Sequence, residues 1–214
     1  VLIIVGMPIR IQSQLFNAAV ALQSGQILGA IPKTYLPNYR EFQEARWFAA
    51  ARDLKLAHVQ IGRFQVPIGH NVLFRSGKLT IGIEICEDMW TPYTPGTRLA
   101  LYGAQIIFNL SASNELAGKN TYLRSLISGL SSQNLCGYVY ASAGYGESST
   151  DTVFTGKGFI AEVGKLLVET PRFTYEERLI ISDIDVMRID NDRMMTNSFN
   201  DSIVDHTERG LLME

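Results

Sequence analysis

The sequence predicts an α/β or α+β fold built on a mixed β-sheet with helices on one face. Two observations lead to this fold class. In the first part of the chain, short apolar runs are joined by turn residues, which is typical of β-hairpins. Further along, apolar strands alternate with segments of helical spacing, which is typical of strand–helix–strand units. The chain has 214 residues, of which 46% are hydrophobic, so it can bury one substantial core.

Turn residues divide the first part of the chain into predicted strands. Ser24-Gly25 and Ser76-Gly77 are two-residue turn signals, and each predicts a hairpin between the apolar runs on either side of it. The strands predicted here are Leu2–Val5, Leu15–Leu22, Gln26–Ile31, Asn71–Arg75 and Lys78–Ile85.

The second part of the chain predicts helices between strands. Leu123, Ile127 and Leu130 recur at helical spacing, which places an apolar face on a helix over Thr121–Asn134. Gln105–Leu110 is a nearly continuous apolar run, as expected for a buried strand. The other predicted elements are a short helix, Thr97–Tyr102, and the strands Tyr138–Ala143, Gly158–Glu162, Leu166–Glu169 and Leu179–Ile184.

Charge and cysteine content narrow the classes of function. A formal net charge of −2 gives no reason to expect nucleic acid or an anionic membrane as a partner. The two cysteines, Cys86 and Cys136, are too few for a disulfide framework, so we expect a reducing cytoplasmic setting and an inert, buried Cys136. We expect no membrane span, because no apolar run reaches about 18 residues. The histidines lack metal-ligand spacing, so we expect no metal site.

The segment Gly82–Trp90 carries the strongest chemical signal. A predicted strand runs directly into Cys86, and two carboxylates and an aromatic residue follow. A cysteine at the end of a strand can face a cavity, and the backbone N–H groups after it can receive a developing oxyanion. Because most free cysteines are buried and inert, this pattern alone leaves both interpretations open.

A second motif lies upstream and favours a catalytic interpretation of Cys86. Lys33 follows a predicted strand, and the loop Lys-Thr-Tyr-Leu-Pro-Asn-Tyr leads into a Glu-x-Arg run at Glu44. With Cys-Glu-Asp-x-Trp at Cys86, the chain resembles the nitrilase (carbon–nitrogen hydrolase) superfamily. The two motifs of this chain are most similar to those of the glutaminase domains of glutamine-dependent NAD synthetases. The resemblance extends from about Val1 to Asp201.

The resemblance implies an α-β-β-α sandwich in which two mixed sheets pack face to face, here incomplete at the N-terminus. It implies a partial hydrolase domain over residues 1–187 and the start of a linker to a synthetase domain over residues 188–214. Because Val1 stands at the start of a predicted core strand, we expect the chain to be an internal fragment of a longer protein.

The resemblance also implies amide hydrolysis through a cysteine thioester. Cys86 matches the nucleophile, and Lys33 matches the lysine that stabilises the oxyanion beside the Glu87 backbone N–H. Glu44 matches an auxiliary glutamate that orients the lysine; alternatively, it is a surface carboxylate paired with a nearby arginine. The third member of the family triad, a glutamate, belongs before Leu2–Val5, so we expect it to be absent from this chain.

For glutamine as the substrate, the resemblance implies a binding pocket with groups for both of its charges. Lys119 stands where the family usually has arginine for the substrate carboxylate, which keeps the charge but loses the bidentate geometry. The ordinary alternatives are packing for the aromatic residues and a cap or turn for Ser113. The predicted substrate-binding residues are Tyr39, Glu87, Trp90, Ser113 and Lys119.

The implied partners are glutamine, a synthetase domain of the same polypeptide and further copies of the protein in a homo-oligomer. ATP and Mg²⁺ are expected only in the synthetase domain, and no cofactor is expected in this one. Two alternatives remain open: a free-standing aliphatic or carbamoyl amidase or nitrilase, and a non-catalytic interaction domain. The joint presence of Lys33, Glu44 and Cys86 argues against the interaction domain.

Overall fold

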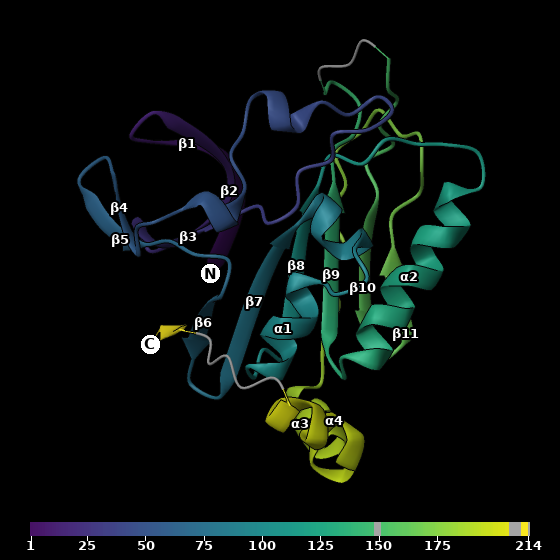
Figure 1. Ribbon diagram of the computed structural model, residues 1–214. Helices are drawn as coiled ribbons and strands as arrows, with labels where there is room; N and C mark the ends of the chain where they lie inside the picture. The colour runs from purple at the N-terminus through teal and green to yellow at the C-terminus, as the bar shows by residue number, and fades with distance from the viewer. Residues whose placement is uncertain (148–150, 206–210, 214) are drawn as a thin grey trace.

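The computed structural model describes residues 1–147, 151–205 and 211–213, the last three by their backbone. Its strands form a seven-stranded mixed sheet, a three-stranded antiparallel sheet and a two-stranded ribbon (Figure 1). The mixed α/β fold expected from the sequence is therefore confirmed. Within the described residues, no helix is long and apolar enough to cross a membrane.

The three-stranded sheet is formed by the first part of the chain. Strand β1 (Leu2–Ile11) pairs with β2 (Gln14–Gln23), which pairs with β3 (Gln26–Pro32). Ser24 and Gly25 have φ angles of 50° and 75°, as the predicted tight hairpin between β2 and β3 requires.

The first strand differs from its prediction. The apolar run predicts Leu2–Val5, but β1 continues through Gly6 and Pro8 to Ile11 along the edge of the sheet. An edge strand tolerates proline, because its outward N–H needs no partner in the sheet. The sequence pattern therefore underestimated the length of this strand.

The seven-stranded sheet carries the site. Its order is β11-β10-β9-β8-β7-β6-β12, and the central strands β7, β8 and β9 are parallel. The carboxyl ends of these three strands meet at one edge, where α/β proteins commonly place their functional residues. The strands are β6 (Val72–Ser76), β7 (Leu79–Ile85), β8 (Ile106–Ser111), β9 (Gly137–Ser142), β10 (Gly158–Glu162), β11 (Lys165–Glu169) and β12 (Leu211–Met213).

Helices cover one face of this sheet. Helix α1 (Pro95–Leu101) connects β7 to β8, and α2 (Lys119–Gln133) connects β8 to β9. Thr94 caps α1 by accepting a hydrogen bond from the Thr97 N–H at 2.8 Å. Leu123 and Ile127 of α2 are fully buried against the sheet, as the helical spacing predicts. Apart from β1, the predicted elements up to β11 are confirmed, with ends shifted by no more than two residues.

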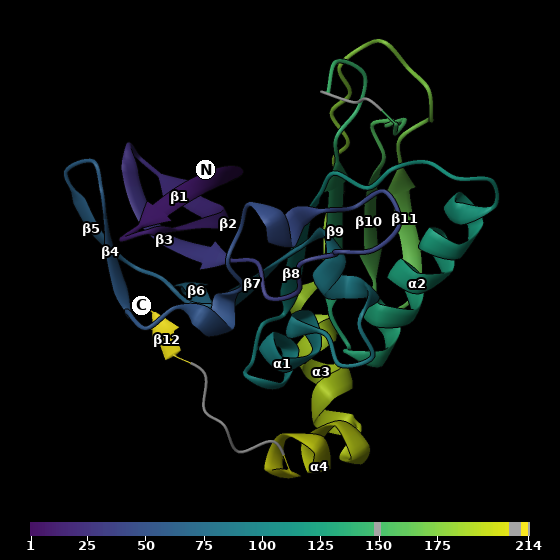
Figure 2. The same ribbon diagram turned by 45° about the horizontal axis from the view of Figure 1, so that its top comes forward.

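The opposite face of the β6–β7 region packs against the three-stranded sheet (Figure 2). Ala19 and Ile31 of the small sheet and Phe74 and Ile83 of the large one share a buried core. The expected face-to-face packing of two sheets is thus present. The outer face of the small sheet carries the ribbon of β4 (His58–Ile61) and β5 (Phe64–Pro67) in place of a helix.

The predicted strand Leu179–Ile184 is wrong, since this segment belongs to no sheet of the described residues. Its apolar residues still alternate. Leu179 and Ile181 are 85% and 78% exposed. Ile180 and Ile184 pack over two glycines of β10 and β9 on the face opposite the helices. The alternation therefore correctly indicates an extended, half-buried segment but gives it no partner strand.

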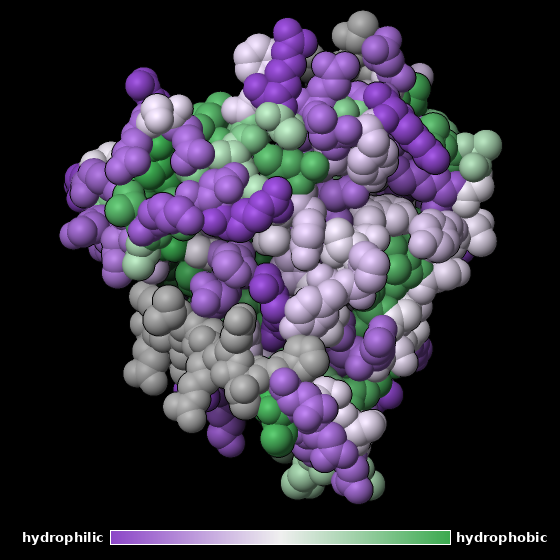
Figure 3. Space-filling model, viewed as in Figure 1, coloured by the Kyte–Doolittle hydropathy of each residue, from purple (hydrophilic) through white to green (hydrophobic). Residues whose placement is uncertain are grey.

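The C-terminal helices lie at the end of the large sheet opposite the site. They are α3 (Val186–Met195) and α4 (Asn197–Asp205) (Figure 1). The Arg193 side chain of α3 attaches them by donating hydrogen bonds to the backbone oxygens of Leu135 and Ala104, at 2.9 and 2.6 Å. On the face of the molecule seen in Figure 3, hydrophobic side chains form separate patches among hydrophilic ones.

Candidate active site

Cys86 stands at a sharp turn between a strand and a helix. Strand β7 ends at Ile85, and the short 3-10 helix η3 (Cys86–Trp90) starts at the cysteine. Cys86 has a φ of 47°, in the left-handed region that is uncommon for non-glycine residues and often marks functional positions. Its N–H donates to Asn109 Oδ1 of the neighbouring strand β8 at 3.2 Å. The half-buried thiol thereby reaches the cavities at the edge of the sheet.

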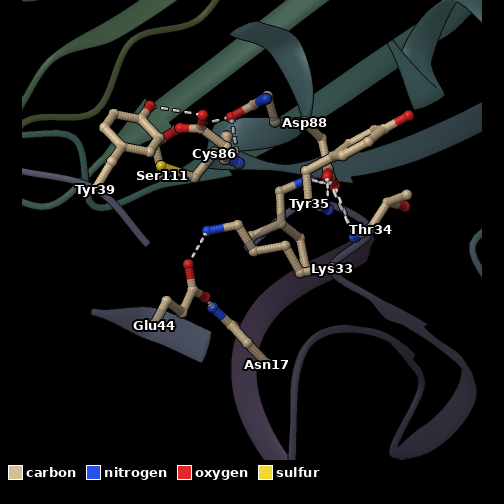
Figure 4. A network of polar contacts seen from close by, with 12 residues as sticks. Asn17, Lys33, Thr34, Tyr35, Tyr39, Glu44, Cys86, Asp88 and Ser111 are labelled. Carbon is tan, nitrogen blue, oxygen red and sulfur yellow. Dashed lines mark hydrogen bonds and ion pairs between the residues drawn. The ribbon is translucent and has the colours of Figure 1, made fainter. Parts of the chain in front are cut away.

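Lys33 approaches Cys86 from the other sheet. It follows β3, its side chain is almost fully buried, and its Nζ forms an ion pair with Glu44 Oε2 (Figure 4). The second oxygen of Glu44 accepts a hydrogen bond from Asn17 Nδ2 of β2 at 2.7 Å. Glu44 therefore contacts the lysine that it is predicted to orient, while that auxiliary role stays a prediction. The ion pair is largely buried and is not a surface contact.

One cavity of about 600 Å³ brings these groups together. Cys86, Lys33 and Glu44 all line it, between the small sheet and the carboxyl edge of the large one. Most of its other walls are apolar or small side chains, which strengthens electrostatic interactions inside it. Glu147 also lines this cavity, and sequence reasoning missed it because it belongs to no recognised motif.

A second cavity, of about 520 Å³, opens on the other side of Cys86. Its walls contain every residue predicted to bind the substrate: Tyr39, Glu87, Trp90, Ser113 and Lys119. These residues come from the loop after β3, from η3, from the segment between β8 and α2 and from the first residue of α2. The structure thus gathers them around the thiol, while their role in binding stays a prediction.

The second cavity has opposite charges on its walls. The Tyr39 hydroxyl donates to Glu87 Oε1 at 2.7 Å, and burial followed by this hydrogen bond raises the pKa of Tyr39 to about 12. Lys119 Nζ lies 5.4 Å from the centre of the Trp90 ring, within the range of a cation–π interaction. Burial is the largest cause of a lowered pKa for Lys119. A carboxylate and an ammonium group are therefore both available to a zwitterionic ligand.

Two further residues of this cavity were missed by sequence reasoning. Asn114 is buried, its Nδ2 donates to Glu41 Oε1, and its Oδ1 accepts from Lys119 Nζ at 2.8 Å. The pKa of Glu41 is lowered, first by a hydrogen bond from the backbone of Glu41 itself and then by the hydrogen bond from Asn114. Asn114 thus fixes the ammonium group, and only its place directly after Ser113 in the sequence could have drawn attention to it.

A network of buried polar residues is connected by hydrogen bonds to the backbone of Cys86. Glu84 of β7 accepts hydrogen bonds from the Tyr138 hydroxyl and, at 2.6 Å, from the Gly96 N–H. Burial raises the pKa of Glu84. Asn109 Nδ2 also points to Glu84, at 3.5 Å, while its Oδ1 holds the Cys86 N–H. This network sets the position of the Cys86 backbone.

The other cysteine adds no chemistry to this site. Cys136 is fully buried, and burial raises its pKa to about 12, so its thiol is unreactive at neutral pH. Within residues 1–147, 151–205 and 211–213, no group of three or more metal-binding side chains could hold an ion.

Comparison with known proteins defines the class to which this fold and site belong. The sequence model of the family "Carbon-nitrogen hydrolase" matches residues 1–194, so the chain belongs to the carbon–nitrogen hydrolases. The family predicted from the two motifs is confirmed. A solved carbon–nitrogen hydrolase from Helicobacter pylori G27 shares the fold, with a TM-score of 0.74 over 96% of this chain, 69% of that chain and 19% identity.

More similar relatives are glutamine-dependent NAD(+) synthetases. The protein of that name from Mycobacterium tuberculosis is 38% identical over 209 residues, which are 96% of this chain and 31% of that protein. The human protein is 29% identical over 81% of this chain and 26% of its own length. The structure from Cytophaga hutchinsonii has a TM-score of 0.72 and 28% identity, and the match covers 82% of this chain and 28% of that one. The chain therefore spans between a quarter and a third of the length of these relatives.

Proposed function

We propose that this chain is the glutaminase part of a glutamine-dependent NAD synthetase. One observation carries the proposal: the predicted glutamine-binding residues line a single cavity that opens onto Cys86. The Lys33–Glu44 pair lines the cavity on the other side of the same thiol. The similarity to glutamine-dependent NAD(+) synthetases supports the choice of substrate.

In the proposed reaction, Cys86 Sγ attacks the carboxamide carbon of glutamine. A C–S bond forms, and the carbonyl π electrons move to oxygen, where the Lys33 ammonium and the Glu87 N–H stabilise the negative charge. The N–H groups of the first helical turn have no partner within the helix, which leaves the one at Glu87 available. Collapse of this intermediate breaks the C–N bond and, after protonation of nitrogen, releases ammonia and leaves a thioester.

Water then hydrolyses the thioester to glutamate and restores the thiol. Both steps need a general base, which takes the thiol proton first and activates water later. We assign this role to a glutamate outside the chain, as the family resemblance implies. Glu44 is already paired with Lys33 and is assigned only the orientation of that lysine.

Opposite charges position the substrate in the second cavity. The Glu87 carboxylate binds the α-ammonium group of glutamine, and Lys119 binds its α-carboxylate. Tyr39 and Ser113 supply hydroxyl groups, and Trp90 forms an apolar wall. The carboxamide then extends toward Cys86, which lies between the two cavities.

The proposal includes a larger polypeptide that uses the ammonia. Its synthetase region would bind ATP, Mg²⁺ and nicotinate adenine dinucleotide, and this domain would need no cofactor. We place the hydrolase domain at residues 1–187 and the start of the linker at residues 188–214. A cytoplasmic homo-oligomer is part of the same proposal.

The test compares two nitrogen sources in the full-length polypeptide. Cys86→Ala should abolish amidation with glutamine and leave amidation with added ammonia intact, because the thiol serves only ammonia release. Cys136→Ala makes the same change at the buried cysteine and should retain both activities. Loss of both activities in Cys86→Ala would show that Cys86 is structural. Efficient cleavage of simple aliphatic amides in preference to glutamine would overturn the proposed substrate.

A further inference from the structure

The two groups proposed to act on the substrate carbonyl come from different sheets. Lys33 follows β3 of the small sheet, and Cys86 follows β7 of the large one. Their relative position therefore depends on what joins the two strand ends. The side chain of Asp88, two residues after the cysteine, reaches the backbone that follows β3 (Figure 4) and the last residue of β7.

Asp88 accepts hydrogen bonds from both segments. Its Oδ1 accepts from the N–H groups of Tyr35 and Thr34 at 2.8 and 3.2 Å. Its Oδ2 accepts from the Ile85 N–H at 3.0 Å and, at 3.4 Å, shares the Thr34 N–H with Oδ1. The Thr34 and Tyr35 groups directly follow Lys33, and Ile85 directly precedes Cys86. One carboxylate thus ties the residues next to both reacting groups.

We propose that Asp88 is a positioning residue that sets Lys33 against Cys86 for the attack on the substrate amide. This inference rests on the proposed function, because it concerns the same reaction. Asp88 does not contact the substrate itself: it lines neither cavity. It acts on the oxyanion site through the backbone on either side.

The chemistry of the position requires a carboxylate. Asp88 is 1% exposed, so its oxygens depend on protein donors and not on water. Hydrogen bonds to an ionised acceptor are shorter and about twice as strong as neutral ones. An asparagine has nearly the same shape, but it keeps one acceptor oxygen and places an N–H group against a backbone donor. Asp88→Asn therefore releases one of the two segments while preserving the volume.

The surroundings of Asp88 shift its pKa in opposite directions. Burial and then the Glu84 carboxyl raise the pKa of Asp88 to about 7. The backbone hydrogen bonds and the Lys33 ammonium act in the lowering direction. Protonation removes acceptor capacity, so the backbone amides that share this carboxylate should report its charge state.

The size of the effect follows from geometry. A displacement of about 1 Å in a catalytic group can cost about 100-fold in rate. In the full-length polypeptide, Asp88→Asn should lower kcat with glutamine about 100-fold, leave KM for glutamine within about twofold, and leave ammonia-supported amidation unchanged. Asp185→Asn is the matched control, because Asp185 Oδ1 accepts the Arg188 N–H at 3.0 Å in α3, at the other end of the sheet.

A second readout uses the 214-residue chain and needs no activity. Amide exchange at Tyr35 or at Ile85 should accelerate at least about tenfold in Asp88→Asn, according to which of the two loses its acceptor oxygen. It should stay unchanged at both in Asp185→Asn, which removes no acceptor from these groups. Should Asp88→Asn fail to fold, the wild-type chain still decides. The NMR signals of the Thr34, Tyr35 and Ile85 amides should then titrate together near pH 7.

Each outcome has one meaning. Faster exchange with normal kcat would overturn the positioning role and leave the proposed function intact. Unchanged exchange at both Tyr35 and Ile85 in Asp88→Asn, or separate midpoints for the three amides, would also overturn it. A full-length wild-type protein that does not cleave glutamine would refute the proposed function, and with it the catalytic meaning of Asp88, while the exchange experiment would still test the contact.

Discussion

The two cavities that meet at Cys86 differ in the chemistry of their walls. The first contains the buried Lys33–Glu44 ion pair among mainly apolar side chains. The second carries the separate charges of Glu87 and Lys119 and a rim of aromatic residues. Under the proposed function, bond breaking depends on the first and substrate recognition on the second. Changes in the first should therefore lower kcat, and changes in the second should raise KM.

The largest expected effect concerns the base that completes the first cavity. Under the proposed function the general base lies outside the chain, so ammonia release from glutamine by the 214-residue chain should be about 10⁴-fold slower than by a protein extended upstream. The measurement is ammonia production by the two purified proteins. Comparable turnover would mean that a carboxylate within the chain serves as the base. The variant Glu147→Gln would then show whether Glu147, the other carboxylate that lines the first cavity, is that base.

Loss of the lysine should have the next largest effect. In the full-length polypeptide, Lys33→Gln removes the positive charge near the oxyanion, and removal of one such donor typically lowers kcat by about 10²–10³-fold. The KM for glutamine should change little, because Lys33 does not line the second cavity. Steady-state kinetics give both constants, with the exposed Lys55→Gln as the control. A mainly raised KM would contradict the separation of the two cavities.

The smallest effect is expected in the second cavity. Lys119→Ala should raise KM for glutamine about 10- to 100-fold, the range of one hydrogen bond to a charged group, and leave kcat nearly unchanged. Because burial lowers the pKa of Lys119, KM should begin to rise at a lower pH than for an exposed lysine, as the ammonium loses its proton. Lys119→Arg keeps the charge and should retain most of the affinity. A lower kcat with normal KM in Lys119→Ala would assign this residue to the chemistry instead.

Much of this arrangement could be predicted because the informative residues stand in local patterns. Lys33 and Cys86 each follow an apolar strand, and both strands end where predicted to within one residue. The family resemblance then added the residues of the second cavity. The hairpins were predictable for a similar reason, since their turns and strands are adjacent in sequence.

The parts that failed depend on partners far away in sequence. Asp88 binds the Tyr35 N–H across 53 positions, and Asn114 binds Glu41 across 73. No local pattern indicates such contacts, so neither residue received a role from the sequence. The segment Leu179–Ile184 failed in the opposite way: its alternation is local and correct, but a strand also needs a neighbour.

The left-handed backbone at Cys86 has a consequence for folding as well as for chemistry. A non-glycine residue in this region stores about 1–3 kcal/mol of conformational strain, which the surrounding structure must outweigh. Alanine at this position would inherit that strain, whereas glycine would be relieved of it. The proposed nucleophile therefore occupies a place where folding stability alone would favour a residue without a side chain. At this turn, a cysteine lowers the stability of the fold relative to glycine but places a thiol at the edge of the cavities.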